Sequence, residues 1–179
     1  MKKVICHVIT SLRGGGAEAN LVKLVTNDRE YKHIVISLIP PEKYSEILIS
    51  KGITVFHLNF NKKLFFIFNF FILLKIIKAN KPDLVQTWLY HSDLVGGLTA
   101  KVCKIDNIVW NVRTSYLPIN SNLKTYFVIK SCAILSWFVP KKIITCANSA
   151  KNIHKNLGYC AKKFEVIFFF QQIALYDLT

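Results

Sequence analysis

The sequence predicts an α/β fold, a Rossmann-like doubly wound parallel sheet with helices on both faces. Three observations support this prediction. Short β-branched runs alternate with longer segments of helical apolar spacing along most of the chain. Three consecutive glycines, Gly14, Gly15 and Gly16, separate the first strand-like run from the first helical segment. Neither a repeat nor a linker interrupts the alternation, and a length of 179 residues fits a single domain.

The expected strands are short apolar runs that end at turn residues. Their apolar residues follow one another without polar alternation, which is typical of strands that helices cover on both faces. Pro40 and Pro41 end the second run, and Pro82 precedes the fourth. We expect strands over residues 3–9, 33–39, 53–58, 83–87, 108–112, 142–146 and 164–168.

The expected helices lie between these strands, over residues 17–27, 42–50, 64–78, 92–102, 122–138 and 149–157. The first places Ala17, Leu21 and Val25 on one face, and the fifth is expected to be long and amphipathic. The third is apolar and aromatic. We interpret it as a core-facing helix, with insertion into a membrane interface as the open alternative, because its uninterrupted apolar part is far below the roughly 20 residues that span a bilayer.

Composition and charge restrict the class of protein. Hydrophobic residues make up 52% of the chain, which excludes a largely disordered protein. The formal net charge of +14 favours an anionic partner, such as a phosphorylated ligand or an acidic membrane face. We expect no nucleic-acid partner, because no recognition motif accompanies the charge.

The cysteines and the N-terminus indicate a cytoplasmic protein. The five cysteines are widely spaced and form no C-x-x-C pair, which argues against a zinc ribbon and a secreted disulfide framework. The N-terminal apolar run is shorter than a signal-peptide core. We therefore expect neither a metal site nor a cleaved leader.

The glycine loop is the first candidate site. In an open parallel sheet, ligands bind beyond the carboxyl ends of the strands, where this loop lies. Glycines allow close backbone approach, and the following helix directs free N–H groups to the same place. Gly14, Gly15, Gly16 and Ala17 therefore predict an anion site, most often one for phosphate, and a permissive turn without a ligand is the alternative.

A nicotinamide cofactor is a poorer prediction for the same loop. Gly14, Gly16 and Ala19 fit the loose dinucleotide fingerprint, but that fingerprint also needs an acid at the end of the second strand. Here the nearest acid, Glu42, lies beyond two prolines. A nicotinamide-dependent oxidoreductase is thus disfavoured, and we expect no cofactor.

Two further side chains are predicted at strand ends. His91 follows the fourth strand, just before an expected helix start capped by Ser92 or Asp93, where it could bond a sugar hydroxyl or a phosphate. Arg113 follows the fifth strand and could clamp an anion. The alternatives are a structural histidine and a solvated arginine. We expect Cys146, after the sixth strand, to be buried rather than catalytic.

The other histidines are expected to be structural. His7 and His57 lie within predicted strands and are expected in the core, whereas His33 and His154 are expected at the surface. Asn148 or Ser149 is expected to cap the helix that contains His154.

Several strings, in this order and spacing, resemble glycosyltransferase family 4. They cover roughly residues 1–167 and comprise VICHVITSLRGGGAE at 4–18, KPDLVQTWLYHSDLVGG at 81–97, WNVR at 110–113, PKKIITCANSA at 140–150, His154, and LGY at 157–159. The resemblance implies the N-terminal half of a GT-B architecture, in which two Rossmann-like domains face each other across a cleft. It also implies sugar transfer from a nucleotide-sugar to an acceptor with retention of configuration and without an essential metal.

The resemblance assigns roles to some of these residues. The glycine loop would lie near the donor phosphates, and His91 would face the reacting sugar. Arg113 matches a commonly basic position, whereas Thr114 stands where similar sequences often carry histidine. The N-terminal domain would mainly hold the acceptor, for which a polysaccharide, a lipopolysaccharide or a lipid-linked glycan is the expectation.

The end of the chain departs from the family pattern. Residues 1–167 are expected to form the acceptor-side domain, and residues 168–179 an aberrant tail that begins with a phenylalanine run. The donor-binding domain is absent from the sequence, which suggests a frameshift or an early stop. A chain of this kind is expected to use a nucleotide-sugar only when the second domain is supplied, and to be inactive alone. A non-catalytic basic module, peripheral at the inner membrane face, is the alternative function.

Overall fold

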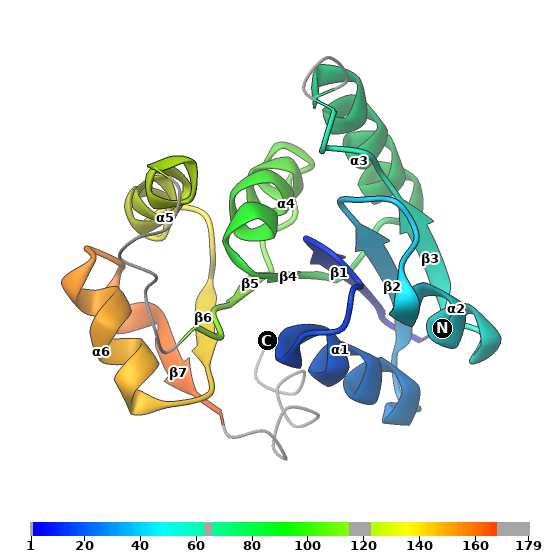
Figure 1. Ribbon diagram of the computed structural model, residues 1–179, viewed down its shortest axis with the longest axis horizontal. Coiled ribbons are helices and arrows are strands. Elements are labelled where there is room, and N and C mark those ends of the chain that lie inside the picture. The colour runs from blue at the N-terminus through cyan, green and yellow to red at the C-terminus, as the bar shows by residue number, and fades with distance from the viewer. Residues whose placement is uncertain (1, 63–65, 115–122, 168–179) are drawn as a thin grey trace.

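A computed structural model describes residues 2–62, 66–114 and 123–167, which form a parallel sheet between two layers of helices (Figure 1). The seven strands have the order β3-β2-β1-β4-β5-β6-β7, and every neighbouring pair is parallel. The strand order reverses between β1 and β4, as in doubly wound folds. The predicted Rossmann-like fold class is confirmed.

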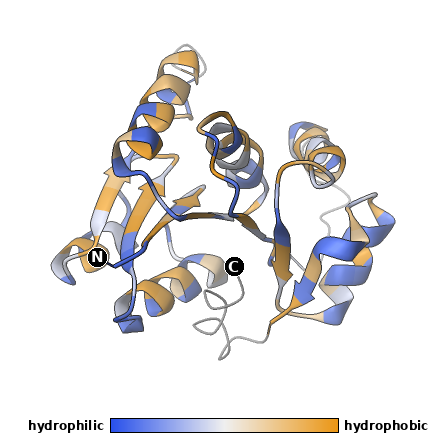
Figure 2. Ribbon diagram, turned by 180° about the vertical axis from the view of Figure 1, so that it is seen from behind, coloured by the Kyte–Doolittle hydropathy of each residue, from blue (hydrophilic) through white to orange (hydrophobic). Residues whose placement is uncertain are grey.

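The strands lie where the sequence places them, with small shifts at their ends. They are β1 (Val4–Ile9), β2 (Lys32–Ser37), β3 (Thr54–His57), β4 (Leu84–Trp88), β5 (Ile108–Asn111), β6 (Lys142–Thr145) and β7 (Phe164–Val166). β4 and β5 are buried along their whole length, because helices cover both sides of the sheet. Figure 2 shows the hydrophobic character of the strands at the centre of the sheet.

In the described ranges, six helices and one short 3-10 helix connect the strands. They are α1 (Gly16–Asn27), α2 (Lys43–Ser50), α3 (Phe66–Asn80), α4 (Tyr90–Val102), α5 (Leu123–Leu135), α6 (Asn148–Asn156) and η2 (Ala161–Lys163). α1 and α2 cover one face of the sheet, and α3, α4 and α5 cover the other (Figure 1). α6 packs against β6 and β7 at one edge. Each face thus has its own apolar core.

Two helix starts differ from the prediction. α4 begins at Tyr90, so that His91 belongs to the helix, and the residue at the N-cap position is Leu89, which makes no side-chain cap. α6 begins at Asn148 with Ala147 before it, and again no side chain caps the helix. Both starts follow directly from strand ends, so the covalent connection and packing fix them without a cap.

The expectation that His33 and His154 lie at the surface is wrong. His33 is 5% exposed and His154 is fully buried. His154 Nδ1 lies 2.7 Å from the carbonyl oxygen of Ala150, and its Nε2 lies 2.7 Å from the hydroxyl of Tyr90. A neutral imidazole can be buried at low cost in free energy when both of its nitrogens have hydrogen-bond partners. The polar residues next to His154 in the sequence do not indicate that such partners are present. His7 is buried as expected, and His57 is half-buried.

The helices α3 and α5 expose more apolar surface than expected. α3 contacts the core with one stripe of side chains only. α5 was predicted to be amphipathic, but it also exposes apolar side chains. α3 exposes Phe66, Ile67, Phe68 and Phe71, and α5 together with the turn after it exposes Leu123, Tyr126, Phe127, Ile134, Trp137 and Phe138. Throughout the described part of the chain, each helix is too short or too polar to traverse a lipid bilayer.

Candidate functional site

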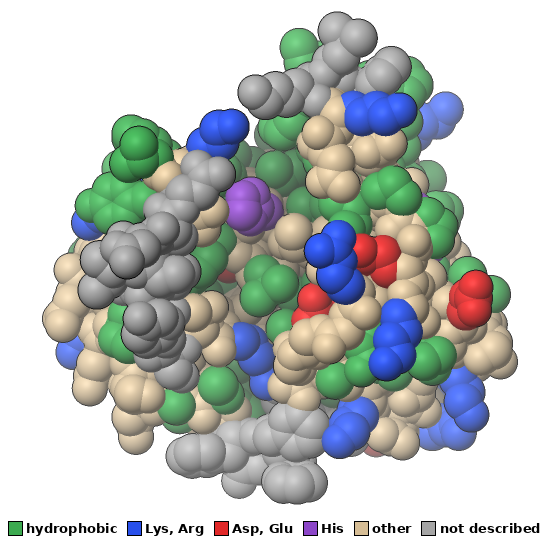
Figure 3. Space-filling model, viewed as in Figure 1, with side chains coloured by type: hydrophobic (Ala, Val, Ile, Leu, Met, Phe, Trp, Pro, Cys, Tyr) green, Lys and Arg blue, Asp and Glu red, His purple; other side chains and the backbone are tan. Residues whose placement is uncertain are grey.

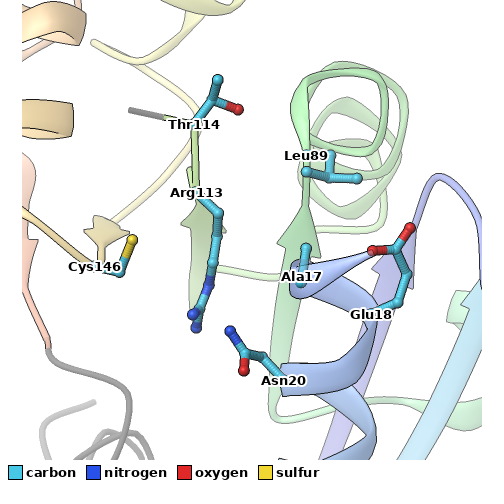
Figure 4. A pocket seen from close by; sticks show the side chains of 8 residues that line it. Ala17, Glu18, Asn20, Leu89, Arg113, Thr114 and Cys146 are labelled. Carbon is cyan, nitrogen blue, oxygen red and sulfur yellow. The ribbon is translucent and has the colours of Figure 1, made fainter. Parts of the chain in front are cut away.

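A pocket of about 420 Å³ opens at the carboxyl ends of the central strands (Figure 4). It lies beside the point where the strand order reverses, between β1 and β4, which is the general position of ligand sites in such sheets. Its lining residues come from the start of α1 and from the segments that follow β4, β5 and β6. They are Gly16, Ala17, Glu18, Asn20, Leu89, Arg113, Thr114 and Cys146.

The glycine loop brings the start of α1 to this pocket. Gly14 has a φ of +145°, a conformation that favours glycine, and Gly15 precedes the helix. A side chain at Gly15 would meet the Glu18 carboxylate, since a Cβ there would lie 2.5 Å from Oε2. Gly16 and Ala17 line the pocket with the first turn of α1, which offers backbone N–H groups and the positive end of the helix dipole.

Glu42 holds the glycine loop in place from the neighbouring connection. Its carboxylate accepts hydrogen bonds from the backbone N–H of Leu12 (3.1 Å) and from Nε of Arg13 (2.9 Å). The backbone N–H of Tyr44 in turn donates to the carbonyl of Leu12. The acid nearest to the end of β2 is thus committed to the loop, which leaves the dinucleotide interpretation without its ribose partner.

Glu18 adds an acidic group to the same pocket. It is 7% exposed, and its Oε1 accepts a hydrogen bond of 3.0 Å from the hydroxyl of Ser11. Figure 4 shows the Glu18 carboxylate directed away from the guanidinium of Arg113. The carboxylate of Glu18 and the guanidinium of Arg113 therefore lie on different sides of the pocket.

Arg113 is the basic side chain of the pocket. Its Nε donates to the Asn111 side-chain oxygen at 3.0 Å, and its guanidinium carbon lies 5.3 Å from the centre of the Trp88 ring. Burial lowers the pKa of Arg113, although a guanidinium stays charged at any physiological pH. Its Nη2 is buried with no hydrogen-bond partner among the described residues. Figure 4 shows the guanidinium pointing along the pocket toward Asn20.

Leu89 lines the pocket with an unusual backbone. Its φ of +72° with a ψ of 155° is a strained conformation for a branched residue, and it forms the turn from β4 into α4. The turn places the first residues of α4 at the edge of the sheet. His91 is the second of these residues; it is exposed and is not among the side chains that line the pocket.

The remaining lining residues carried no clear sequence signal. Asn20 lies one helical turn after Gly16, so helical spacing from the glycine loop could have indicated it. Cys146 was expected to be buried but is half-buried and lines the pocket. Thr114, at the position where similar sequences often carry histidine, also lines it. Gly14 shapes the loop without lining the pocket. Across the described ranges, no three His, Cys, Asp or Glu side chains are grouped to hold a metal ion.

Comparison with solved structures defines the fold as that of the N-terminal domain of GT-B glycosyltransferases. Anabaena Alr3699/HepE, solved in complex with UDP, has a TM-score of 0.77 at 16% identity, covering 94% of this chain and 44% of its own. A glycosyltransferase from Rickettsia africae has a TM-score of 0.64 at 18% identity, with 93% and 43% covered. The UDP-N-acetylglucosamine 2-epimerase of Rickettsia bellii has a TM-score of 0.63 at 14% identity, with 99% and 48% covered.

The chain belongs to the family described as Glycosyltransferase Family 4, whose model matches residues 14–168. It spans less than half the length of the solved structures named above. No curated protein matches it. The family is therefore shown by the sequence, whereas the solved structures show the fold.

Proposed function

We propose that this chain is the acceptor-side half of a retaining glycosyltransferase that moves a sugar from a nucleotide-sugar to a glycan acceptor. The observation that carries the proposal is the pocket at the strand ends, where the start of α1 and Nη2 of Arg113 converge, a buried atom without a hydrogen-bond partner in the described ranges. Backbone N–H groups and a desolvated guanidinium are donors that phosphate oxygens accept. The pocket would hold the donor phosphates.

Catalysis would require a second, donor-binding domain facing this pocket. Sugar transfer depends on holding donor and acceptor together and on stabilising charge at the leaving phosphate. The described residues supply one side of such a site. His91, exposed at the start of α4, would face the reacting sugar.

The acceptor class we propose is a polysaccharide, a lipopolysaccharide or a lipid-linked glycan. A lipid-linked acceptor would bring the protein to an anionic leaflet, and the helices α3 and α5 suit that surface. Their exposed side chains are aromatic and aliphatic, with Lys75 and Lys78 on α3 and Lys62 shortly before it. Figure 3 shows hydrophobic side chains gathered over α5, with a basic side chain beside them.

Charge favours lipid over protein as the partner of this face. Residues 47–82 and 107–164 contain no acidic residue, so the segments that carry α3 and α5 are uniformly basic. Lysine is depleted in protein–protein interfaces, whereas aromatic residues combined with lysine are typical of helices that lie in a membrane interface. We therefore propose peripheral attachment to an anionic membrane through α3 and α5.

The phosphate site is tested by binding of inorganic pyrophosphate and UDP to the 179-residue chain, measured by titration calorimetry. We expect Arg113→Gln to weaken binding roughly 10- to 100-fold, because a charge-assisted hydrogen bond contributes about 1.5–3 kcal/mol. Arg29→Gln is the matched control, since Arg29 is exposed and outside the pocket but carries the same charge. Equal affinities of the two variants would contradict the proposed site.

A further inference from the structure

A continuous line of buried polar side chains runs beneath α1 and ends at the candidate site. Trp88 Nε1 lies 3.3 Å from His7 Nδ1, and His7 Nε2 lies 3.0 Å from His33 Nδ1. At the far end, His33 Nε2 lies 3.1 Å from Oδ2 of Asp28, at the C-terminal end of α1. All four side chains are at least nine-tenths buried. Burying such polar groups in a core costs free energy unless they form hydrogen bonds with one another.

The donors and acceptors in this line allow one arrangement of protons. An indole N–H can only donate, so His7 Nδ1 is an acceptor and the proton of the neutral ring is on Nε2. That proton points to His33 Nδ1, and the proton of His33 is then on Nε2, facing the Asp28 carboxylate. Burial, and then the neighbouring His33, lowers the pKa of His7 well below 6.5, which keeps the ring neutral.

Trp88, the last side chain of this line, contacts Arg113, which lines the pocket. The guanidinium carbon of Arg113 lies 5.3 Å from the centre of the Trp88 ring, within the range of a cation–π interaction. Within the described residues, the guanidinium donates one hydrogen bond, from Nε to the side-chain oxygen of Asn111. The face of the indole and the side chain of Asn111 together orient the two terminal nitrogens of Arg113.

We infer that His7 is a positioning residue of the anion site: it fixes the indole of Trp88, and through it the guanidinium of Arg113. His7 itself touches no ligand. Without an acceptor at this position the indole N–H would be buried and unsatisfied, at a cost of about 1–3 kcal/mol, and the ring would turn to relieve it. The inference deepens the proposed function and rests on it for the role of Arg113.

Three variants of the full 179-residue chain test the inference. His7→Leu removes the acceptor, and His7→Asn returns one, because the Asn Oδ1 can take the place of Nδ1. Ile5→Ala is the matched control, since Ile5 lies two residues earlier on the same face of β1, is 2% exposed and has no polar group in its side chain. It lowers stability without removing a donor or an acceptor from the line.

Two readouts are measured at pH 7.5: the ¹⁵N–¹H signal of the Trp88 indole, assigned with Trp88→Phe, and the affinity for inorganic pyrophosphate. We expect His7→Leu to shift the indole signal and to weaken binding roughly 3- to 30-fold, the range of a lost cation–π contact. His7→Asn should restore affinity to within about threefold, and Ile5→Ala should change neither readout.

The outcomes separate this inference from the proposed function. An unmoved indole signal or unchanged pyrophosphate affinity in His7→Leu overturns the inference. If His7→Leu does not fold, Trp88→Phe decides: unchanged affinity without the indole N–H overturns it, and weakened affinity supports it. Failure of the unaltered chain to bind pyrophosphate would contradict the proposed function and the role of His7 at that site, whereas the indole signal would still report whether His7 orients Trp88.

Discussion

At the scale of single residues, Asp93 shows how folding changes the chemistry of a side chain. It lies in the first turn of α4, where an exposed carboxylate would interact favourably with the helix dipole. The structure buries it completely. Its Oδ1 accepts a hydrogen bond of 2.5 Å from the hydroxyl of Thr87, and its Oδ2 has no such partner in the described part of the chain. Burial raises the pKa of Asp93 to about 8, so it is largely protonated at neutral pH.

The raised pKa of Asp93 predicts a specific pH dependence of stability. The folded state binds the proton more tightly than the unfolded state, whose pKa is near 3.8. The stabilising contribution is complete below about pH 4 and is lost as pH rises toward 8, at up to about 1.4 kcal/mol per pH unit. Asp93→Asn has no carboxyl group that could release a proton in this pH range. Its free energy of unfolding should therefore rise relative to the unaltered chain between pH 5 and 8.

Urea unfolding at pH 5, 6, 7 and 8 measures this difference. The buried histidines titrate with the opposite sign, because burial lowers the pKa values of His7, His33 and His154. They are common to both proteins and cancel in the comparison. Parallel stability curves for the two proteins would show that Asp93 is ionised in the folded state.

At the scale of elements, α4 lies unusually close to the sheet because of two glycines. A Cβ at Gly96 would be 2.9 Å from Cγ1 of Val8, and one at Gly97 would be 2.7 Å from Nε1 of Trp110. Glycine inside a helix normally costs about 1 kcal/mol relative to alanine. Here it permits the close approach that sets the position of the first turn of α4 beside the pocket.

Gly97→Ala should therefore destabilise the protein although alanine favours helix formation. We expect a loss of about 1–3 kcal/mol, typical of overpacking, because the added Cβ would meet the buried side chains of Trp110 and Val139. Gly16→Ala is the control, since no atom lies within 4 Å of its added Cβ, and it should change stability by less than about 0.5 kcal/mol. Thermal and urea unfolding compare the two. Equal stability would contradict the close packing of α4.

At the scale of the whole molecule, exposed apolar side chains lie on two helices whose segments contain no acidic residue. The net charge of +14 is combined with apolar side chains on α3 and α5 that are up to 75% exposed. Helices that are apolar on every side are buried in larger cores or lie in membranes. The proposed membrane face predicts that binding combines an apolar and an electrostatic contribution.

Co-sedimentation with vesicles tests this face. We expect binding to vesicles with about one-third anionic lipid, weaker binding at high salt, and little binding to neutral vesicles. Replacing Ile67 and Phe71 by Asp should lower binding at least about tenfold, because charged groups would have to enter the interface. Ile49→Asp is the control, since Ile49 is 56% exposed on α2, in the opposite layer. Equal loss in both variants, or no binding at any salt concentration, would contradict the proposal.

The residues that sequence reasoning named for the site fall into two groups. Gly16, Ala17 and Arg113 line one pocket, because the carboxyl ends of parallel strands meet at one edge. His91 lies at the same edge, outside the lining. Asn20 and Leu89 were missed, although helical spacing from Gly16 could have indicated Asn20. Cys146 was named at the end of the sixth strand but was expected to be buried, whereas it lines the pocket. Leu89 in particular was detectable only by its positive φ, which no propensity predicts for leucine.

The sequence by itself determined the order of the elements, the parallel sheet and the edge at which a ligand would bind, because these follow from local periodicity and from the rules of strand connection. Only the tertiary structure decided which polar side chains are buried and which partners they meet. His7 and His33 are 26 residues apart, and His7 and Trp88 are 81 apart. Pairing over such distances depends on strand register and helix packing. The apolar strand around His7 predicted its burial but not its partners, and the neighbours of His33 did not predict its burial.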